Sequence, residues 1–157
     1  MHKLPEVEEA KELMNEAMGW STFKWLFEKP RVRRTADRAN AALDHLNRAV
    51  KTQWSEAAKA AYKKLTGKVA AIQQSPEKGL GEQSSAEIEL LIEKVIQADR
   101  VAHRARMSAE DTFDQAEKQM STSLAKEGCK RAIHSWELYE KAIRNAEAVA
   151  KKSHPAE

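Results

Sequence analysis

Two stretches of the chain, residues 31–66 and 85–127, carry apolar side chains at every third or fourth position. The first stripe starts at Val32 and ends at Leu65, and the second starts at Ile88 and ends at Leu124. This spacing places one narrow apolar stripe along a helix, with an average period of about 3.5 residues, which is typical of coiled coils. The pattern therefore predicts an all-α protein, an elongated antiparallel bundle of three to four helices.

Proline and glycine set the expected boundaries in the first half of the chain. Pro5 suits the first turn of a helix, and Gly19 is expected to end that helix. Pro30 is likewise expected to begin the first long helix, with Gly67 as its C-terminal cap. The predicted elements are a helix over about 5–18, an aromatic connector over 20–29 and a helix over about 30–66.

The second half of the chain is expected to form two more helices within one domain, 1–157. Ser84 and Glu87 form a capping box, which predicts a helix start there. After Gly128 the apolar stripe slips by one residue, so a turn at this glycine is favoured over one continuous helix, which would make a swapped dimer. The predicted elements are a loop over 75–83, a helix over about 84–127, a helix over about 129–152 and a frayed tail over 153–157.

This arrangement predicts an apolar end with few helices to cover it. A turn at Gly128 leaves the last helix too short to reach the hairpin formed by about residues 56–74 and 84–102. Because soluble monomers rarely expose wide apolar patches, we expect self-association there as a homodimer, or contact with another helical protein. The alternative is that helix 5–18 or segment 68–74 folds over this end. The expected interface residues are Leu65, Val69, Ile72, Ile88, Leu91, Ile92, Val95 and Ile96.

One short segment combines aromatic residues with a run of arginines. Its members are Trp20, Phe23, Trp25, Phe27, Arg31, Arg33, Arg34 and Arg38. One interpretation is an aromatic plug that closes the bundle. The other is a peripheral binding surface, either for an anionic membrane, with aromatic rings at the headgroups, or for nucleic-acid phosphate.

Charge and composition narrow the class of protein further. The 157 residues include 27 basic and 24 acidic side chains, a net charge of +3, whereas proteins that wrap nucleic acid usually have a larger basic excess. A nucleic-acid or membrane partner is therefore not favoured. The sequence shows no secretory h-region and no long apolar run, so we expect a cytoplasmic protein.

The residues that usually carry chemistry are few and scattered. Cys129 is the single cysteine, and we interpret it as a small buried residue rather than a reactive thiol. Asp99 and His103 share a helical face, which we interpret as a solvated or packed polar pair rather than a metal site, since the pair recurs nowhere else. No glycine-rich phosphate loop occurs. We expect no cofactor, no metal and no small-molecule substrate, and hence a non-catalytic interaction or scaffold protein.

Overall fold

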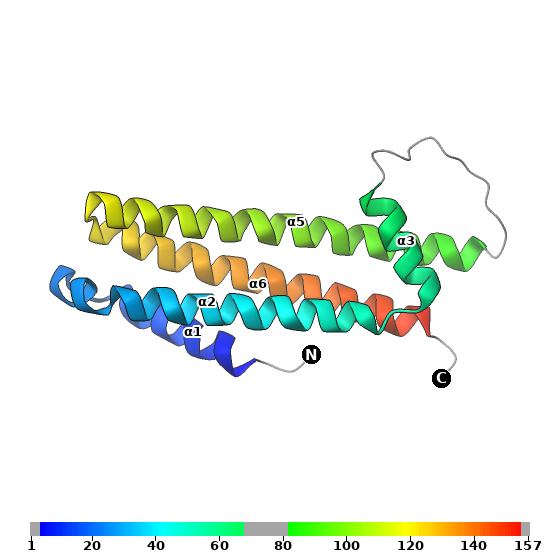
Figure 1. Ribbon diagram of the computed structural model, residues 1–157, viewed down its shortest axis with the longest axis horizontal. Coiled ribbons are helices and arrows are strands. Elements are labelled where there is room, and N and C mark those ends of the chain that lie inside the picture. The colour runs from blue at the N-terminus through cyan, green and yellow to red at the C-terminus, as the bar shows by residue number, and fades with distance from the viewer. Residues whose placement is uncertain (1–3, 68–81, 155–157) are drawn as a thin grey trace.

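The computed structural model describes residues 4–67 and 82–154, and within these ranges the chain forms five helices and no strand (Figure 1). The fold class is therefore all-α, as the apolar stripes predict. The helices are α1 (Pro5–Ala17), α2 (Thr22–Thr52), α3 (Glu56–Thr66), α5 (Glu82–Gln119) and α6 (Thr122–Ser153). None of these helices is both long and apolar enough to cross a membrane.

Helix α6 is the central element of the bundle. It packs along α5, which runs antiparallel to it, and it also contacts α1, α2 and α3 (Figure 1). Its inward face is closed by Trp136 and Ile143, both essentially without solvent exposure. The Trp136 indole Nε1–H also donates a hydrogen bond of 2.8 Å to Asn40 Oδ1 on α2. This bond gives the largest buried side chain a fixed partner on a neighbouring helix.

The predicted helix over 30–66 has the wrong start, whereas its predicted end is confirmed, because α3 ends at Thr66 with Gly67 as its C-cap. Helix α2 begins at Thr22, so most of the predicted connector 20–29 is helical, and Pro30 lies inside the helix. Ser21 explains this start, because its side-chain oxygen accepts a hydrogen bond from the Lys24 backbone N–H. Pro30 removes only the helical bond to the carbonyl of residue 26, on an exposed face where water can replace it.

The same predicted helix is interrupted after Thr52. Trp54 leaves the helical path, is buried, and donates its Nε1–H to the Ala146 carbonyl of α6 at 2.9 Å. Ser55 then caps the N-terminus of α3 by accepting a hydrogen bond from the Ala58 N–H. The predicted apolar stripe does not reveal this break, because it runs on from Trp54 to Ala57, whereas the structure exposes Ala57 and buries Ala58.

The predicted turn at Gly128 is also wrong. Helix α5 ends at Gln119, the chain turns at Met120 and Ser121, and α6 runs from Thr122 through Gly128 to Ser153. Met120 adopts a positive φ of 50°, which reverses the chain direction, and the Ser121 side chain caps α6. The helix predicted over 84–127 is therefore shorter, and the last helix is longer.

Gly128 is explained by packing rather than by a turn. A Cβ at this position would lie 2.8 Å from Cδ1 of Phe113 on α5, a distance shorter than any ordinary contact. The ring of Phe113 is itself buried, so it has little room to move. The glycine allows α5 and α6 to approach closely just below their connection.

The end of the bundle predicted to lack cover is covered by its own chain. Because α6 extends to Ser153, it reaches alongside the first part of α5, and α3 crosses α5 and also contacts α6 (Figure 1). Ile92 and Val95 consequently have no solvent exposure. The prediction that this end is uncovered is therefore wrong for Ile92 and Val95, whereas Leu90 is 62% exposed. Leu65, Ile88, Leu91 and Ile96 are partly buried against the core, whereas Val69, Ile72, most of loop 75–83 and residues 155–157 lie outside the described residues.

Candidate binding site at the tip of the bundle

The opposite end of the bundle carries the aromatic segment. We call this end the tip; it comprises residues 18–27 and the turn at 120–121 (Figure 1). Its two tryptophans, Trp20 and Trp25, are each only 6% exposed and pack edge to face with ring centroids 5.3 Å apart. The Trp25 Nε1–H donates to the Ala17 carbonyl at 3.1 Å. The tryptophans therefore close the core, as the plug interpretation expects.

The phenylalanines of the same segment do the opposite. Phe23 and Phe27 are 68% and 69% exposed and contact each other edge to face, with centroids 5.0 Å apart. Leu26, on the same turn, and Met120, in the α5–α6 turn, are also mostly exposed. Four large apolar side chains thus face solvent at one end of the described structure, which is typical of an interaction surface.

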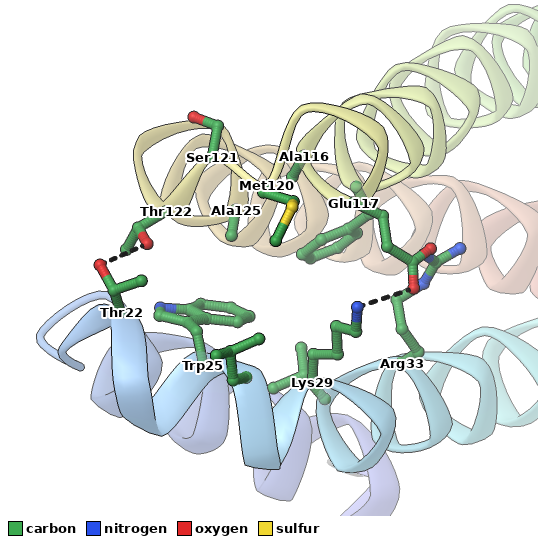
Figure 2. Close-up of a pocket in the computed structure, with 13 residues that line it drawn as sticks. Thr22, Trp25, Lys29, Arg33, Ala116, Glu117, Met120, Ser121, Thr122 and Ala125 are labelled. Carbon is green, nitrogen blue, oxygen red and sulfur yellow. Dashed lines mark hydrogen bonds and ion pairs between the residues drawn. The ribbon is translucent and has the colours of Figure 1, made fainter.

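A cleft of about 150 Å³ opens beside these side chains, between α2 and the α5–α6 turn (Figure 2). We call it the tip cleft. Its lining is mainly apolar and comes from both sides of the turn and from the first turns of α2. The lining residues are Thr22, Trp25, Leu26, Lys29, Val32, Arg33, Phe113, Ala116, Glu117, Met120, Ser121, Thr122 and Ala125.

Two polar contacts hold the sides of the tip cleft together (Figure 2). At the outer side, the hydroxyls of Thr22 and Thr122 are 2.9 Å apart. At the inner side, Lys29 Nζ lies 3.4 Å from a carboxylate oxygen of Glu117. Both contacts are exposed, so each contributes little to stability, and together they mark the two ends of the opening of the tip cleft.

The arginines that follow the tip fall into two groups. Arg31 pairs with Glu28 at 2.8 Å, and Arg33 pairs with Asp114 of α5 at 3.1 Å. Arg34 and Arg38 are exposed, and neither makes an ion pair within residues 4–67 and 82–154. The eight predicted residues therefore do not form one patch: two are core, two are exposed rings, two are paired arginines and two are unpaired arginines.

Below the tip cleft, α2 and α5 are joined mainly by side chains. Their backbones hardly approach each other, and both lie against α6. Arg106 of α5 donates two hydrogen bonds of 3.0 Å to Asp44 of α2, and its guanidinium lies 4.2 Å from the Tyr139 ring centroid. Burial is the main cause that raises the pKa of Tyr139, and Arg106 opposes that shift. We call these side-chain contacts between α2 and α5 the seam, and we propose that they fix the register of the two helices.

Asp99 belongs to this seam. Its carboxylate accepts hydrogen bonds from Asn47 Nδ2 at 3.0 Å and from Lys51 Nζ at 2.7 Å, while His103 is exposed. Both carboxylate oxygens of Asp99 are thus held by α2. The interpretation of Asp99 as a packed polar residue agrees with these contacts.

The thiol of Cys129 is expected to be unreactive in the folded protein. Its side chain is fully buried, and burial raises its pKa to about 12. Because the thiolate is the reactive form, we expect iodoacetamide at mildly alkaline pH to modify the native protein far more slowly than the urea-unfolded chain. Mass spectrometry of the alkylated fraction over time measures both rates. Equal rates would contradict the buried position.

The tip cleft was only half visible in the sequence. The aromatic segment marks its α2 side, but nothing marks Phe113, which the apolar stripe places simply in the core, or Ala125, which lies on neither stripe. Met120 also falls on a stripe, so the sequence predicts it to be buried. Only the three consecutive hydroxyl residues 121–123 after Met120 could have indicated a helix N-cap, and hence the turn.

Comparisons with protein-family models, curated proteins and solved structures find no match to the chain.

Proposed function

We propose that this chain is a non-catalytic interaction protein that binds another helical protein through its tip. The observation that carries the proposal is the tip cleft, an apolar opening among exposed Phe23, Leu26, Phe27 and Met120. Exposed apolar surface on a rigid helical scaffold is typical of protein interfaces. A cytoplasmic location belongs to the same proposal and rests on the sequence alone.

The size of the tip cleft supports one large apolar side chain as its occupant. An engineered apolar cavity of about 150 Å³ is able to bind benzene, so a cleft of this volume accepts a single aromatic ring. Apolar anchors that fill such pockets usually carry most of the binding energy of an interface. The partner is therefore expected to present a phenylalanine, leucine or tryptophan on an exposed helix.

The self-association expected through residues 65–96 has lost its main argument, because Ile92 and Val95 are covered by α6 and α3. Binding to an anionic membrane or to nucleic acid is also less well supported than binding to a protein. Trp20 and Trp25, which would anchor the protein at a headgroup region, are buried in the core. These observations move the proposed binding surface to the tip and favour a protein partner.

Indole has the size of an aromatic side chain and serves as the probe for the tip cleft. We expect it to bind saturably, with a Kd of about 1 mM, and to shift the Trp25 indole N–H signal in a nitrogen-edited NMR spectrum. The titration uses a variant carrying Phe23→Ser and Phe27→Ser, in which the tip cleft is the main apolar surface left at the tip. Absence of any saturable shift would contradict the proposal.

Matched variants show whether indole binds in the tip cleft. Ala125 lines the tip cleft, so Ala125→Phe fills it and is expected to abolish indole binding. Ala148 is exposed on the same helix, so Ala148→Phe is expected to leave binding unchanged. Ala116→Leu, a smaller filling on α5, provides a second blocked form if Ala125→Phe does not fold.

A further inference from the structure

The tip has a cleft with room for an aromatic ring, and it also has two exposed aromatic rings that fill no cleft. Phe23 and Phe27 are the most exposed aromatic side chains of the described residues, and the tip cleft has the volume of one ring. With about 3.6 residues per turn, Leu26 lies between the cleft side of α2 and its Phe23–Phe27 side. One copy therefore cannot place its own phenylalanines in its own cleft.

We propose that the occupant of the tip cleft is a second copy of this chain. The two α2 helices lie side by side and point the same way, related by a two-fold axis parallel to them. This axis turns the Phe23–Phe27 side of each copy toward the tip cleft of the other, so both insertions are equivalent. The inference rests on the proposed function, because it requires that the tip cleft accept an aromatic side chain.

Charge complementarity supports this pairing. Below the phenylalanines, the same side of α2 continues into Arg34 and Arg38, which make no ion pair within the described ranges. On α5, Asp114 and Glu110 lie on the side that faces α2, and Glu110 also makes no ion pair within those ranges. In the proposed dimer the arginines of one copy face these carboxylates of the other.

The heights of these charges along the bundle also match. The contact between Arg33 and Asp114 at 3.1 Å places Asp114 level with residues 33–34 of α2. Glu110 lies between Asp114 and Arg106 on α5, which pair with Arg33 and Asp44, so it lies level with the middle of the 33–44 stretch of α2. Because a two-fold axis parallel to α2 preserves height, Arg38 of one copy meets Glu110 of the other.

The charges at the tip favour a second copy over an anionic bilayer. Arg31 and Lys29 are paired with Glu28 and Glu117, so acidic side chains stand next to the exposed rings. An anionic membrane would repel these carboxylates, whereas a self-complementary protein surface contains both signs.

The test is the molar mass of the full chain, measured by light scattering and sedimentation over a dilution series up to tens of micromolar. We expect a dimer for the wild-type chain. The Phe23→Ser and Phe27→Ser double variant is expected to dimerise about 100-fold more weakly, since buried aromatic anchors dominate interfaces. Leu90→Ser, at the other end of α5 and equally exposed, is the matched control and leaves the dimer intact.

Charge exchange tests the orientation of the dimer. Arg38→Glu is expected to weaken the dimer about tenfold at low salt, and adding Glu110→Arg is expected to restore it. Arg144→Glu, an exposed charge change on α6, is the control and has no effect. Failure of Glu110→Arg to restore the dimer would overturn the parallel arrangement.

Other outcomes overturn the inference directly. A wild-type monomer at tens of micromolar excludes a second copy, and so does a dimer that survives the double phenylalanine replacement. If the wild-type chain is a monomer and sediments with anionic vesicles through Phe23 and Phe27, the tip binds a bilayer instead. Indole binding to the double variant separates the two proposals: a monomer whose tip cleft still binds indole keeps the proposed function and loses only the dimer.

Discussion

Replacing Trp136 with alanine is expected to lower the free energy of unfolding by about 3–5 kcal/mol, the largest single effect in the bundle. Trp136 is the largest fully buried side chain, and it lies on α6, the helix that contacts all the others. Its removal leaves a cavity that the neighbouring helices, α2 and α5 among them, cannot fully close. It also removes the hydrogen bond to Asn40, leaving that amide oxygen without its partner.

Urea denaturation followed by far-ultraviolet circular dichroism measures this loss. Trp136→Phe keeps most of the ring volume but loses the Nε1–H donor, so its effect is expected to be clearly smaller than that of Trp136→Ala. Ala148→Gly, on the exposed face of α6, controls for general helix weakening, at about 1 kcal/mol. A loss for Trp136→Ala no greater than that of this control would contradict the central position of α6.

Replacing Gly128 with alanine is expected to lower the free energy of unfolding by about 1–3 kcal/mol. Helix propensity alone predicts the opposite sign, since alanine stabilises a helix interior by about 1 kcal/mol relative to glycine. The packing effect is larger because the new Cβ would lie 2.8 Å from the buried ring of Phe113. The sign of this change therefore distinguishes a packing glycine from a tolerated one.

A double-mutant cycle assigns the effect to that one contact. Phe113→Leu removes the ring atoms that meet the new Cβ, so in this background Gly128→Ala is expected to be neutral or stabilising. Gly67→Ala, near the end of α3, is a control in which the nearest atom to the new Cβ is 3.4 Å away. Equal effects of Gly128→Ala with and without the Phe113 ring would contradict the contact.

The fold class followed from the sequence because helical periodicity is a local property that repeats over many turns. Chain reversals were less visible, since each depends on a few residues. Ser55 and Ser121 cap α3 and α6, whose starts the sequence analysis did not locate, but serine is common inside sequences of this kind. The apolar stripe runs through both breaks, because Trp54 and Leu124 continue its spacing while the backbone changes direction.

Gly128 misled the prediction for a physical reason. Glycine permits a turn, but it also permits close approach of two helices, and the sequence does not distinguish the two uses. Placing the reversal at Gly128 shortened the last helix and left the far end of the bundle without cover. The expected dimer through Ile92 and Val95 followed from that single misplaced turn.

The candidate site could be located from the sequence only in part. The cluster of aromatic residues marked the tip, yet the choice between buried and exposed rings depends on which face of α2 meets α1. That face contains Trp25 but not Phe23 or Phe27. The α5 and α6 side of the tip cleft, including Phe113 and Ala125, is brought together by tertiary contacts that no local pattern encodes.

The left-handed backbone of Met120 bears on which residue suits this position. A residue other than glycine costs about 1–2 kcal/mol in this conformation, so chain reversal alone would be served better by glycine. Methionine instead supplies a long, polarizable thioether at the rim of the tip cleft. Such a side chain adapts to the shape of a bound group. In the proposed function, the stability of this turn and the binding of a partner therefore favour different residues at position 120.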